Sequence, residues 1–232
     1  MASAPPARTA PPVAVTLDYA QATPALPPTH PLPTRDYQAR TVWRCHRMDP
    51  ATGLYRSTVF NSGGRGDARF SPIFDSTGAV IPTLYAATEA RAAIAEVLLH
   101  DMPSPSTGAI FDATHAMLPS EGNMVSSVEV PALTLVPLTS FGLQAVGLTV
   151  PDLIGGNSVR YPHTRAWARW IHENMPSVQG LYWMSRRDDE NGCMVLFGDR
   201  IPSGLTELTR EPLRAYRLEL FEALDAMGAV GI

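Results

Sequence analysis

The chain has 232 residues, a formal net charge of −4 at neutral pH and a hydrophobic content of 45%. This length suits one domain with an extension and can bury a core without disulfide or metal cross-links. The mild acidity argues against direct nucleic-acid binding, which needs a basic face, and no apolar run reaches the roughly 18 residues of a membrane span. Since no basic stretch precedes an apolar segment at the N-terminus, we expect no secretory signal and a cytoplasmic protein.

Residues 1–35 differ in composition from the rest of the chain. They hold nine of the 22 prolines, together with much alanine and threonine. Such a segment buries little apolar surface, so we expect a disordered or extended tail. Residues 36–232 are expected to form one folded domain, with regular structure beginning near Arg40.

Short strands and a few helices then alternate along the domain. Stretches rich in β-branched and aromatic residues predict strands at 41–45, 83–87, 180–184 and 193–197, with a β-prone stretch at 127–138 that Pro131 and Pro137 interrupt. Helical periodicity predicts helices at 88–100, 164–174 and 209–227. Thr88 is the expected N-cap of the first helix. Because strands and helices mix without regular βαβ alternation, the predicted fold class is α+β.

The predicted helix at 88–100 carries one narrow polar stripe on an otherwise apolar surface. Glu89, Glu96 and His100 form this stripe, while Ile94 and Leu98 lie on the apolar arc. A solvated stripe on a buried helix is the simpler interpretation. The functional alternative is a carboxylate that a well-packed helix presents into a cleft.

Two further stretches could contribute to a site. The loop 61–67 is rich in glycine, carries Arg65, and could approach an anion closely, although it matches neither a Walker loop nor a dinucleotide-binding fingerprint. The strand at 180–184 ends in Ser185 and two arginines, without the surroundings of an esterase serine. Cys45 and Cys193 lie far apart in sequence and outside any zinc-binding spacing, so we expect free buried thiols and no metal site.

Read in order, several short motifs resemble the RES domain, which is named for an arginine, a glutamate and a serine. The matching stretches are Trp-Arg44, Gly-Asp-Ala-Arg69-Phe-Ser-Pro, Leu-Tyr85-Ala-Ala, Ala-Ile-Ala-Glu96-Val and Leu-Tyr-Trp-Met-Ser185-Arg. The resemblance covers about residues 40–200. The loop between the second and third motifs is longer than usual in the family. The nearby Arg65 is an alternative to Arg69 as the phosphate-binding arginine.

This resemblance implies an ADP-ribosyltransferase-like mixed sheet with flanking helices, and an enzyme that cleaves the nicotinamide–ribose bond of NAD⁺. By the same resemblance, Glu96 and Ser185 are the catalytic residues, and Arg44, Arg69 and Tyr85 bind the substrate. NAD⁺ is then a substrate, with no cofactor and with inorganic phosphate as an optional co-substrate. The implied protein partner is an Xre-like antitoxin.

Two other functions remain open at this point. The same site could transfer ADP-ribose to a protein, in which case the tail at residues 1–35 could be the delivery segment of a secreted effector. Alternatively, the fold could serve as a nucleotide-binding protein without catalysis. Replacement of Glu96 or Arg69 would favour that second alternative, and both residues are present.

Overall fold

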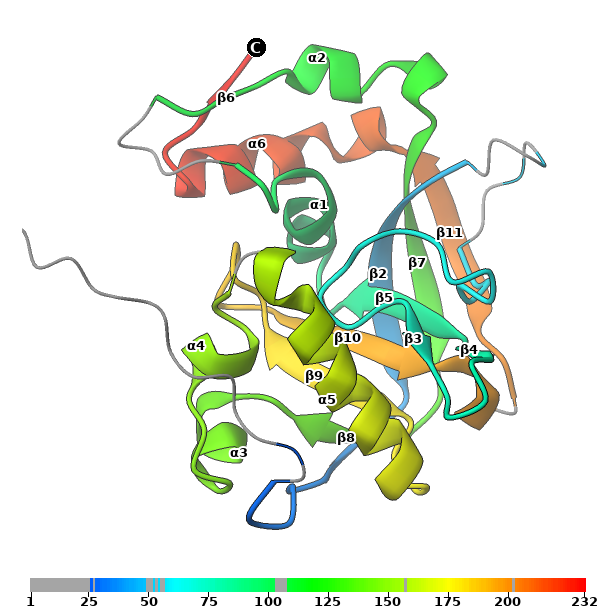
Figure 1. Ribbon diagram of the computed structural model, residues 1–232. Coiled ribbons are helices and arrows are strands. Elements are labelled where there is room, and N and C mark those ends of the chain that lie inside the picture. The colour runs from blue at the N-terminus through cyan, green and yellow to red at the C-terminus, as the bar shows by residue number, and fades with distance from the viewer. Residues whose placement is uncertain are drawn as a thin grey trace, which may run out of the picture.

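The computed structural model describes residues 26, 28–48, 52, 54, 57–102, 108–156, 158–201 and 203–232. An eight-stranded sheet forms its centre, in the order β1-β8-β9-β10-β5-β2-β7-β11 (Figure 1). The strands are Arg35–Tyr37 (β1), Leu133–Pro137 (β8), Gly180–Met184 (β9), Gly192–Phe197 (β10), Thr83–Ala87 (β5), Arg40–Arg47 (β2), Asn123–Val130 (β7) and Thr206–Pro212 (β11). Within this sheet only the neighbours β8 and β9 run parallel, so the sheet is mixed and the predicted α+β class is confirmed.

Helices flank this sheet, and two small two-stranded sheets complete the fold (Figure 1). The helices are Ala90–Leu98 (α1), Ala113–Ala116 (α2), Ser140–Gln144 (α3), Val150–Leu153 (α4), Tyr161–Asn174 (α5) and Arg217–Ala226 (α6). The small sheets pair Ile73–Phe74 (β3) with Val80–Ile81 (β4), and Ile110–Phe111 (β6) with Val230–Gly231 (β12). No helix in the described part of the chain is both long and apolar enough to cross a membrane.

The two faces of the sheet bury different sets of side chains. On one face, Ile94 of α1 and Trp167 of α5 are fully buried in a cluster that also holds Phe197 of β10. Val42 of β2 and Leu196 of β10 belong to a second, smaller cluster. Since successive side chains of a strand point to opposite faces, Leu196 and Phe197 separate into these two clusters. The larger cluster fixes α1 and α5 on the face that carries the candidate site.

The N-terminal end of α1 differs from the prediction. The helix is shorter than 88–100, and its N-cap residue is Glu89, whose side chain makes no capping hydrogen bond. The hydroxyl of Thr88 instead accepts a hydrogen bond from the amide of Gly192 at 3.0 Å. A long-range contact with β10 has therefore replaced the local cap that the sequence favours.

The predicted helix at 209–227 is also partly wrong. Its first part belongs to β11, which pairs with β7 up to Pro212, and a 3₁₀ turn at Leu213–Tyr216 precedes α6. Proline lacks an amide donor but fits an edge strand, and β11 is an edge of the sheet. Pairing with β7 therefore overrides the helical pattern in this stretch.

The boundary at residue 36 is a few residues too late. Leu32 is buried in the larger cluster, and Arg35 already pairs with Leu135 of β8. Residues 1–25 and 27 of the predicted tail lie outside the described residues. The core therefore includes Leu32, an apolar side chain from the proline-rich stretch.

We expect the Leu32→Ala variant to lose about 2–3 kcal/mol of unfolding free energy, because it leaves a cavity in a packed core. A chain that begins at Asp36 should lose at least as much. Urea unfolding followed by tryptophan fluorescence measures both, with Leu218→Ala as the control because Leu218 is 66% exposed. An unchanged midpoint for Leu32→Ala would show that this segment does not contribute to the core.

Candidate active site

The sheet opens between β2 and β5, and a cavity of about 300 Å³ lies at the opening. These two strands pair only at Trp43 and Ala87, whereas β2 pairs with β7 along its whole length. Both strands line the cavity beyond that single pair, from Trp43 to Cys45 and from Tyr85 to Ala87. The cavity therefore occupies the place where the ladder between β2 and β5 would have continued.

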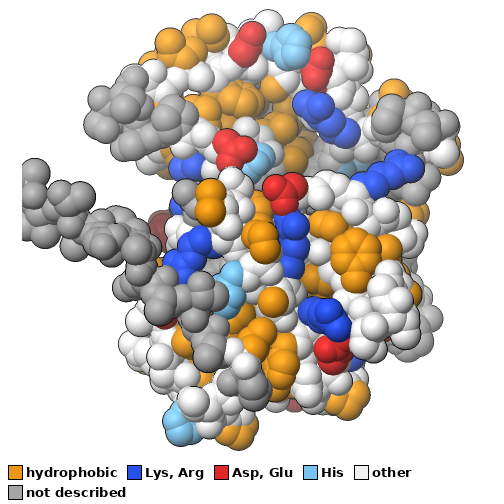
Figure 2. Space-filling view, in the orientation of Figure 1, with side chains coloured by type: hydrophobic (Ala, Val, Ile, Leu, Met, Phe, Trp, Pro, Cys, Tyr) orange, Lys and Arg blue, Asp and Glu red, His pale blue; other side chains and the backbone are white. Residues whose placement is uncertain are grey.

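The wall of the cavity combines aromatic and charged side chains. The aromatic residues are Trp43, Tyr85, Tyr161 and Trp183, and the arginines are Arg44, Arg69, Arg186 and Arg187. Two carboxylates, Glu96 and Asp67, also line it, and Asp67 forms an ion pair with Arg165. Figure 2 shows arginine side chains spread over the face that carries α5, with acidic side chains between them.

Glu96 is brought together with Ser185, as the sequence predicted. Its Oε1 atom accepts a hydrogen bond from the Ser185 hydroxyl at 2.6 Å and from the Arg186 amide at 2.8 Å. Within the described residues its Oε2 atom has no hydrogen bond and the carboxylate has no ion pair. One oxygen is thus fixed by the protein, and the other is available to a ligand.

Arg69 lies in the cavity wall with its guanidinium held from several sides. One terminal nitrogen donates to the carbonyl oxygens of Leu153 at 3.4 Å and Gly156 at 3.2 Å, and the guanidinium lies over the ring of Tyr161, 5.3 Å from its centre. Burial and the neighbouring Arg186 lower the pKa of Arg69. Its other terminal nitrogen and Nε make no hydrogen bond within the described residues, so one edge of the fork can bind an anion bidentately.

Arg65, the alternative to Arg69, lies elsewhere. Its backbone amide and carbonyl bond to the side chain of Asn61 in a surface turn, and it does not line the cavity. Glu89, which shares the predicted stripe with Glu96, is exposed and also lies outside the cavity wall. The structure therefore places Arg69 and Glu96 at the cavity, and neither Arg65 nor Glu89.

The backbone around Arg69 is clamped by α5 and β5. The Thr164 hydroxyl donates to the carbonyl oxygen of Arg69, and Arg165 donates to that of Ala68 at 2.9 Å. From the other side, the Tyr85 hydroxyl accepts a hydrogen bond from the amide of Phe70 at 2.7 Å. Burial raises the pKa of Tyr85, so its phenol stays protonated and keeps one proton to donate.

Arg44 occupies the opening in a different way from Arg69. Its Nε donates to the carbonyl oxygen of Tyr85 at 2.9 Å, and a terminal nitrogen donates to the carbonyl of Ser57. Burial lowers the pKa of Arg44 to about 10, which still leaves it charged at neutral pH. The Arg44 side chain thus supplies a hydrogen bond to β5 where strand pairing stops, and its part in substrate binding stays a prediction.

Sequence analysis assigned no specific role to Arg186, Arg187 or Tyr161, which also line the cavity. Arg186 donates to the carbonyl of Gly156 at 3.0 Å, and Arg187 donates to those of His100 at 2.5 Å and Met102 at 3.0 Å. Tyr161 contributes its ring to Arg69. The two arginines follow Ser185 directly in the sequence, which was the available signal. No local pattern marks Tyr161, because only the packing of α5 brings it to Arg69.

The structure is thus an α+β domain with a cavity at an opening of its sheet. Several arginines line this cavity, together with the Glu96 carboxylate, which has no ion pair within the described residues. The model of the RES domain matches residues 41–219, and the chain belongs to this family. A chain in the crystal structure of the M. tuberculosis MbcT–MbcA toxin–antitoxin complex has a similar fold, with a TM-score of 0.56 and 18% sequence identity. The match covers 81% of this chain and 92% of that one. No curated protein sequence matches this chain.

The two cysteines line the cavity but are buried free thiols. Burial raises the pKa of Cys45 to about 12, and burial together with the nearby Glu96 raises that of Cys193. A thiolate is the reactive form, and a raised pKa lowers its fraction at any pH below that value.

We therefore expect iodoacetamide at pH 8 to alkylate both cysteines at least about 100-fold more slowly than a free thiol. Peptide mass spectrometry on the folded protein measures these rates, and the same protein in urea is the control, in which both should react fast. Rapid alkylation of Cys193 in the folded state would show that it is an activated nucleophile.

Proposed function

We propose that this protein is the toxin of a toxin–antitoxin pair and that it cleaves the nicotinamide–ribose bond of NAD⁺ in the cytoplasm. The observation that carries the proposal is the Glu96 carboxylate, which is held at one oxygen by Ser185 and Arg186 and lies in a cavity with aromatic and arginine walls. Membership of the RES-domain family and a fold similar to a chain of a toxin–antitoxin complex support it.

The chemistry of this bond suits a site with one such carboxylate. Nicotinamide leaves the ribose as a neutral molecule from a cationic ring nitrogen, so no general acid has to protonate it. The pair of carboxylates that an ordinary glycosidase uses is therefore unnecessary. The negative charge of Glu96 can stabilise the oxocarbenium-like transition state, and Oε2 is its unengaged atom. Water as the acceptor gives ADP-ribose and a proton, and phosphate gives ADP-ribose-1″-phosphate.

The arginines fit the other end of the molecule. Arg69, Arg186 and Arg187 are each anchored to main-chain carbonyls through one terminal nitrogen, and each keeps other N–H groups for the pyrophosphate. The Tyr85 phenol, with one proton to donate, faces the same cavity as Trp43 and Trp183. These aromatic side chains would pack against the nicotinamide and its ribose.

Replacement of Glu96 by glutamine tests the proposal. Glutamine keeps the size and most of the hydrogen bonding but removes the charge, so turnover of NAD⁺ should fall by about 100-fold or more. The measurement is product mass after incubation of purified protein with NAD⁺, with and without inorganic phosphate. ADP-ribose, ADP-ribose-1″-phosphate or an ADP-ribosylated protein would each identify the acceptor. Intact NAD⁺ under all conditions would refute the proposal.

Two further variants separate catalysis from binding and from general damage. Glu89→Gln changes an exposed carboxylate at the N-cap of the same helix, outside the cavity, so it should keep full turnover and stay toxic on expression. Arg69→Ala should mainly weaken NAD⁺ binding, whereas Glu96→Gln should leave binding intact. If Glu89→Gln abolished turnover and Glu96→Gln did not, the catalytic carboxylate would have been assigned wrongly.

The proposed partner is an Xre-like antitoxin that covers the cavity. An acidic segment of that partner could pair with the arginines of the wall in place of a pyrophosphate. We therefore expect the purified complex to bind NAD⁺ at least about tenfold more weakly than the protein alone, as measured by calorimetry. Co-expression should restore growth and the NAD⁺ pool. A complex that neutralises the protein yet binds NAD⁺ with unchanged affinity would exclude occlusion.

A further inference from the structure

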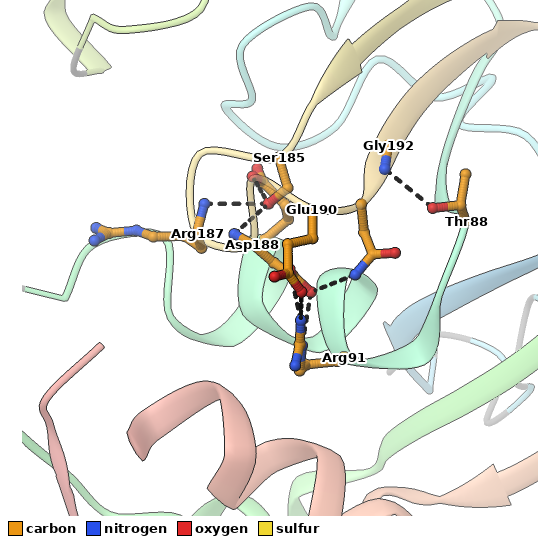
Figure 3. A network of polar contacts seen from close by, with 9 residues as sticks. Thr88, Arg91, Ser185, Arg187, Asp188, Glu190 and Gly192 are labelled. Carbon is orange, nitrogen blue, oxygen red and sulfur yellow. Dashed lines mark hydrogen bonds and ion pairs between the residues drawn. The ribbon is translucent and has the colours of Figure 1, made fainter. Parts of the chain in front are cut away.

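The loop that joins β9 to β10 docks on α1 at two separate points, of which Figure 3 shows the one at Arg91. At one point, Ser185 and Arg186 donate to Glu96. At the other, Asp188 accepts from Arg91. Arg91 and Glu96 lie five positions apart on α1, which separates them by about 7.5 Å along the helix axis. Helix α1 thus binds this short loop through two of its side chains, the cationic Arg91 and the anionic Glu96.

The ion pair between Arg91 and Asp188 is bidentate, and the Asp188 carboxylate is buried. Nε of Arg91 lies 2.8 Å from Oδ2 of Asp188, and a terminal nitrogen lies 2.9 Å from Oδ1. The Asp188 side chain is 4% exposed, and its Oδ2 also accepts from the Asn191 amide group at 2.9 Å. Glu190 also contacts Arg91, at 3.1 Å, but its side chain is 81% exposed.

The loop in turn determines where the Ser185 proton points. The amides of Arg187 and Asp188 both donate to the Ser185 Oγ, at 3.1 Å each (Figure 3). A hydroxyl accepts through two lone pairs and donates one proton. With both acceptor positions occupied, the proton is directed to Glu96 at 2.6 Å. In this arrangement Ser185 orients Glu96 and is not poised as a nucleophile.

The base of the loop is bonded to Thr88, the residue that was expected to cap α1. The Thr88 amide donates to the carbonyl of Gly192 at 2.8 Å, and its hydroxyl accepts from the Gly192 amide at 3.0 Å. These bonds fix the end of the loop at Gly192 but do not reach its middle. Among the described contacts, the middle of the loop is tied to the first turn of α1 by the buried Asp188 and by the exposed Glu190, both through Arg91.

We propose that Arg91 and Asp188 are positioning residues, which hold the loop so that Ser185 and Arg186 both donate to Oε1 of Glu96 and leave Oε2 facing the cavity. The catalytic part of this proposal rests on the proposed function. Without the ion pair, the loop can shift and the carboxylate loses its fixed direction. A displacement of about 1 Å at a reacting group can lower turnover by about 100-fold. Arg69 lies outside this loop, and the guanidinium groups of Arg186 and Arg187 keep their own anchors on the carbonyls of Gly156, His100 and Met102, so substrate binding should change little.

The test uses the full-length protein with Asp188→Asn and Arg91→Lys, which remove the bidentate pair in two different ways. Each should lower kcat for NAD⁺ by roughly 10- to 100-fold, while KM and the calorimetric Kd change less than about threefold. Glu190→Gln is the matched control, because it removes the exposed contact to the same arginine and should leave kcat unchanged.

A double-mutant cycle distinguishes positioning from general destabilisation. In a Glu96→Gln background, Asp188→Asn should lower kcat by less than about threefold, because the group through which it acts is already lost. Equal factors in the two backgrounds would show that the pair acts independently of Glu96, and would overturn its positioning role. If Asp188→Asn does not fold, Arg91→Lys is measured in the same cycle.

Amide hydrogen exchange gives a readout that needs no turnover. The amides of Arg186, Arg187 and Asp188 donate to Glu96 and Ser185, so both variants should lose at least about tenfold protection at these amides and none in α5. Unchanged protection would overturn the proposal. If the unmodified protein does not cleave NAD⁺, the proposed function is wrong, and the exchange data still decide whether the pair holds the loop.

Discussion

The opening of the sheet between β2 and β5 is the constraint on which the rest of the site depends. Two antiparallel strands that separate after one residue pair leave backbone groups without partners, which a folded protein has to satisfy. Arg44 does so for the carbonyl of Tyr85 with a side-chain nitrogen. The hydrogen bond from Arg44 thus lowers the free-energy cost of the interrupted strand pairing. It does not close the gap between β2 and β5, so both strands still line the cavity.

Helix α1 brings the chemistry to that opening because it is built largely from small residues. Ala92, Ala93 and Ala95 are buried in the larger core cluster. Small side chains let the backbone of a helix lie close to its neighbours. The backbone of α1 is therefore near enough to the cavity for the Glu96 side chain to line it. The same helix carries Arg91 toward the loop after β9. A bulkier residue at the buried alanine positions would displace both contacts together.

The sequence predicted those parts of the fold and site that depend on local patterns. Strands β5 and β9 have the predicted bounds, because β-branched and aromatic runs end at turn residues there. Of the residues that the resemblance pointed to, Arg69 and Glu96 line one cavity and Ser185 bonds to Glu96. What failed depended on contacts across the chain: Thr88 bonds to Gly192, β11 pairs with β7, and Leu32 packs in the core. Tyr161 was missed for the same reason, since it is marked only by its position beside Arg69.

Main-chain carbonyl oxygens, and not carboxylates, hold the arginines Arg69, Arg186 and Arg187 at the cavity. A carbonyl fixes a guanidinium in place but does not cancel its charge. Like charges therefore repel one another in the folded protein until an anion binds, and an anion that binds only the folded state stabilises it by mass action. If NAD⁺ is that anion, the protein destroys its own stabilising ligand. As the NAD⁺ concentration falls, the folded state loses the stabilisation that bound NAD⁺ gives. A larger fraction of the protein then unfolds, and cellular proteases can degrade the unfolded chains.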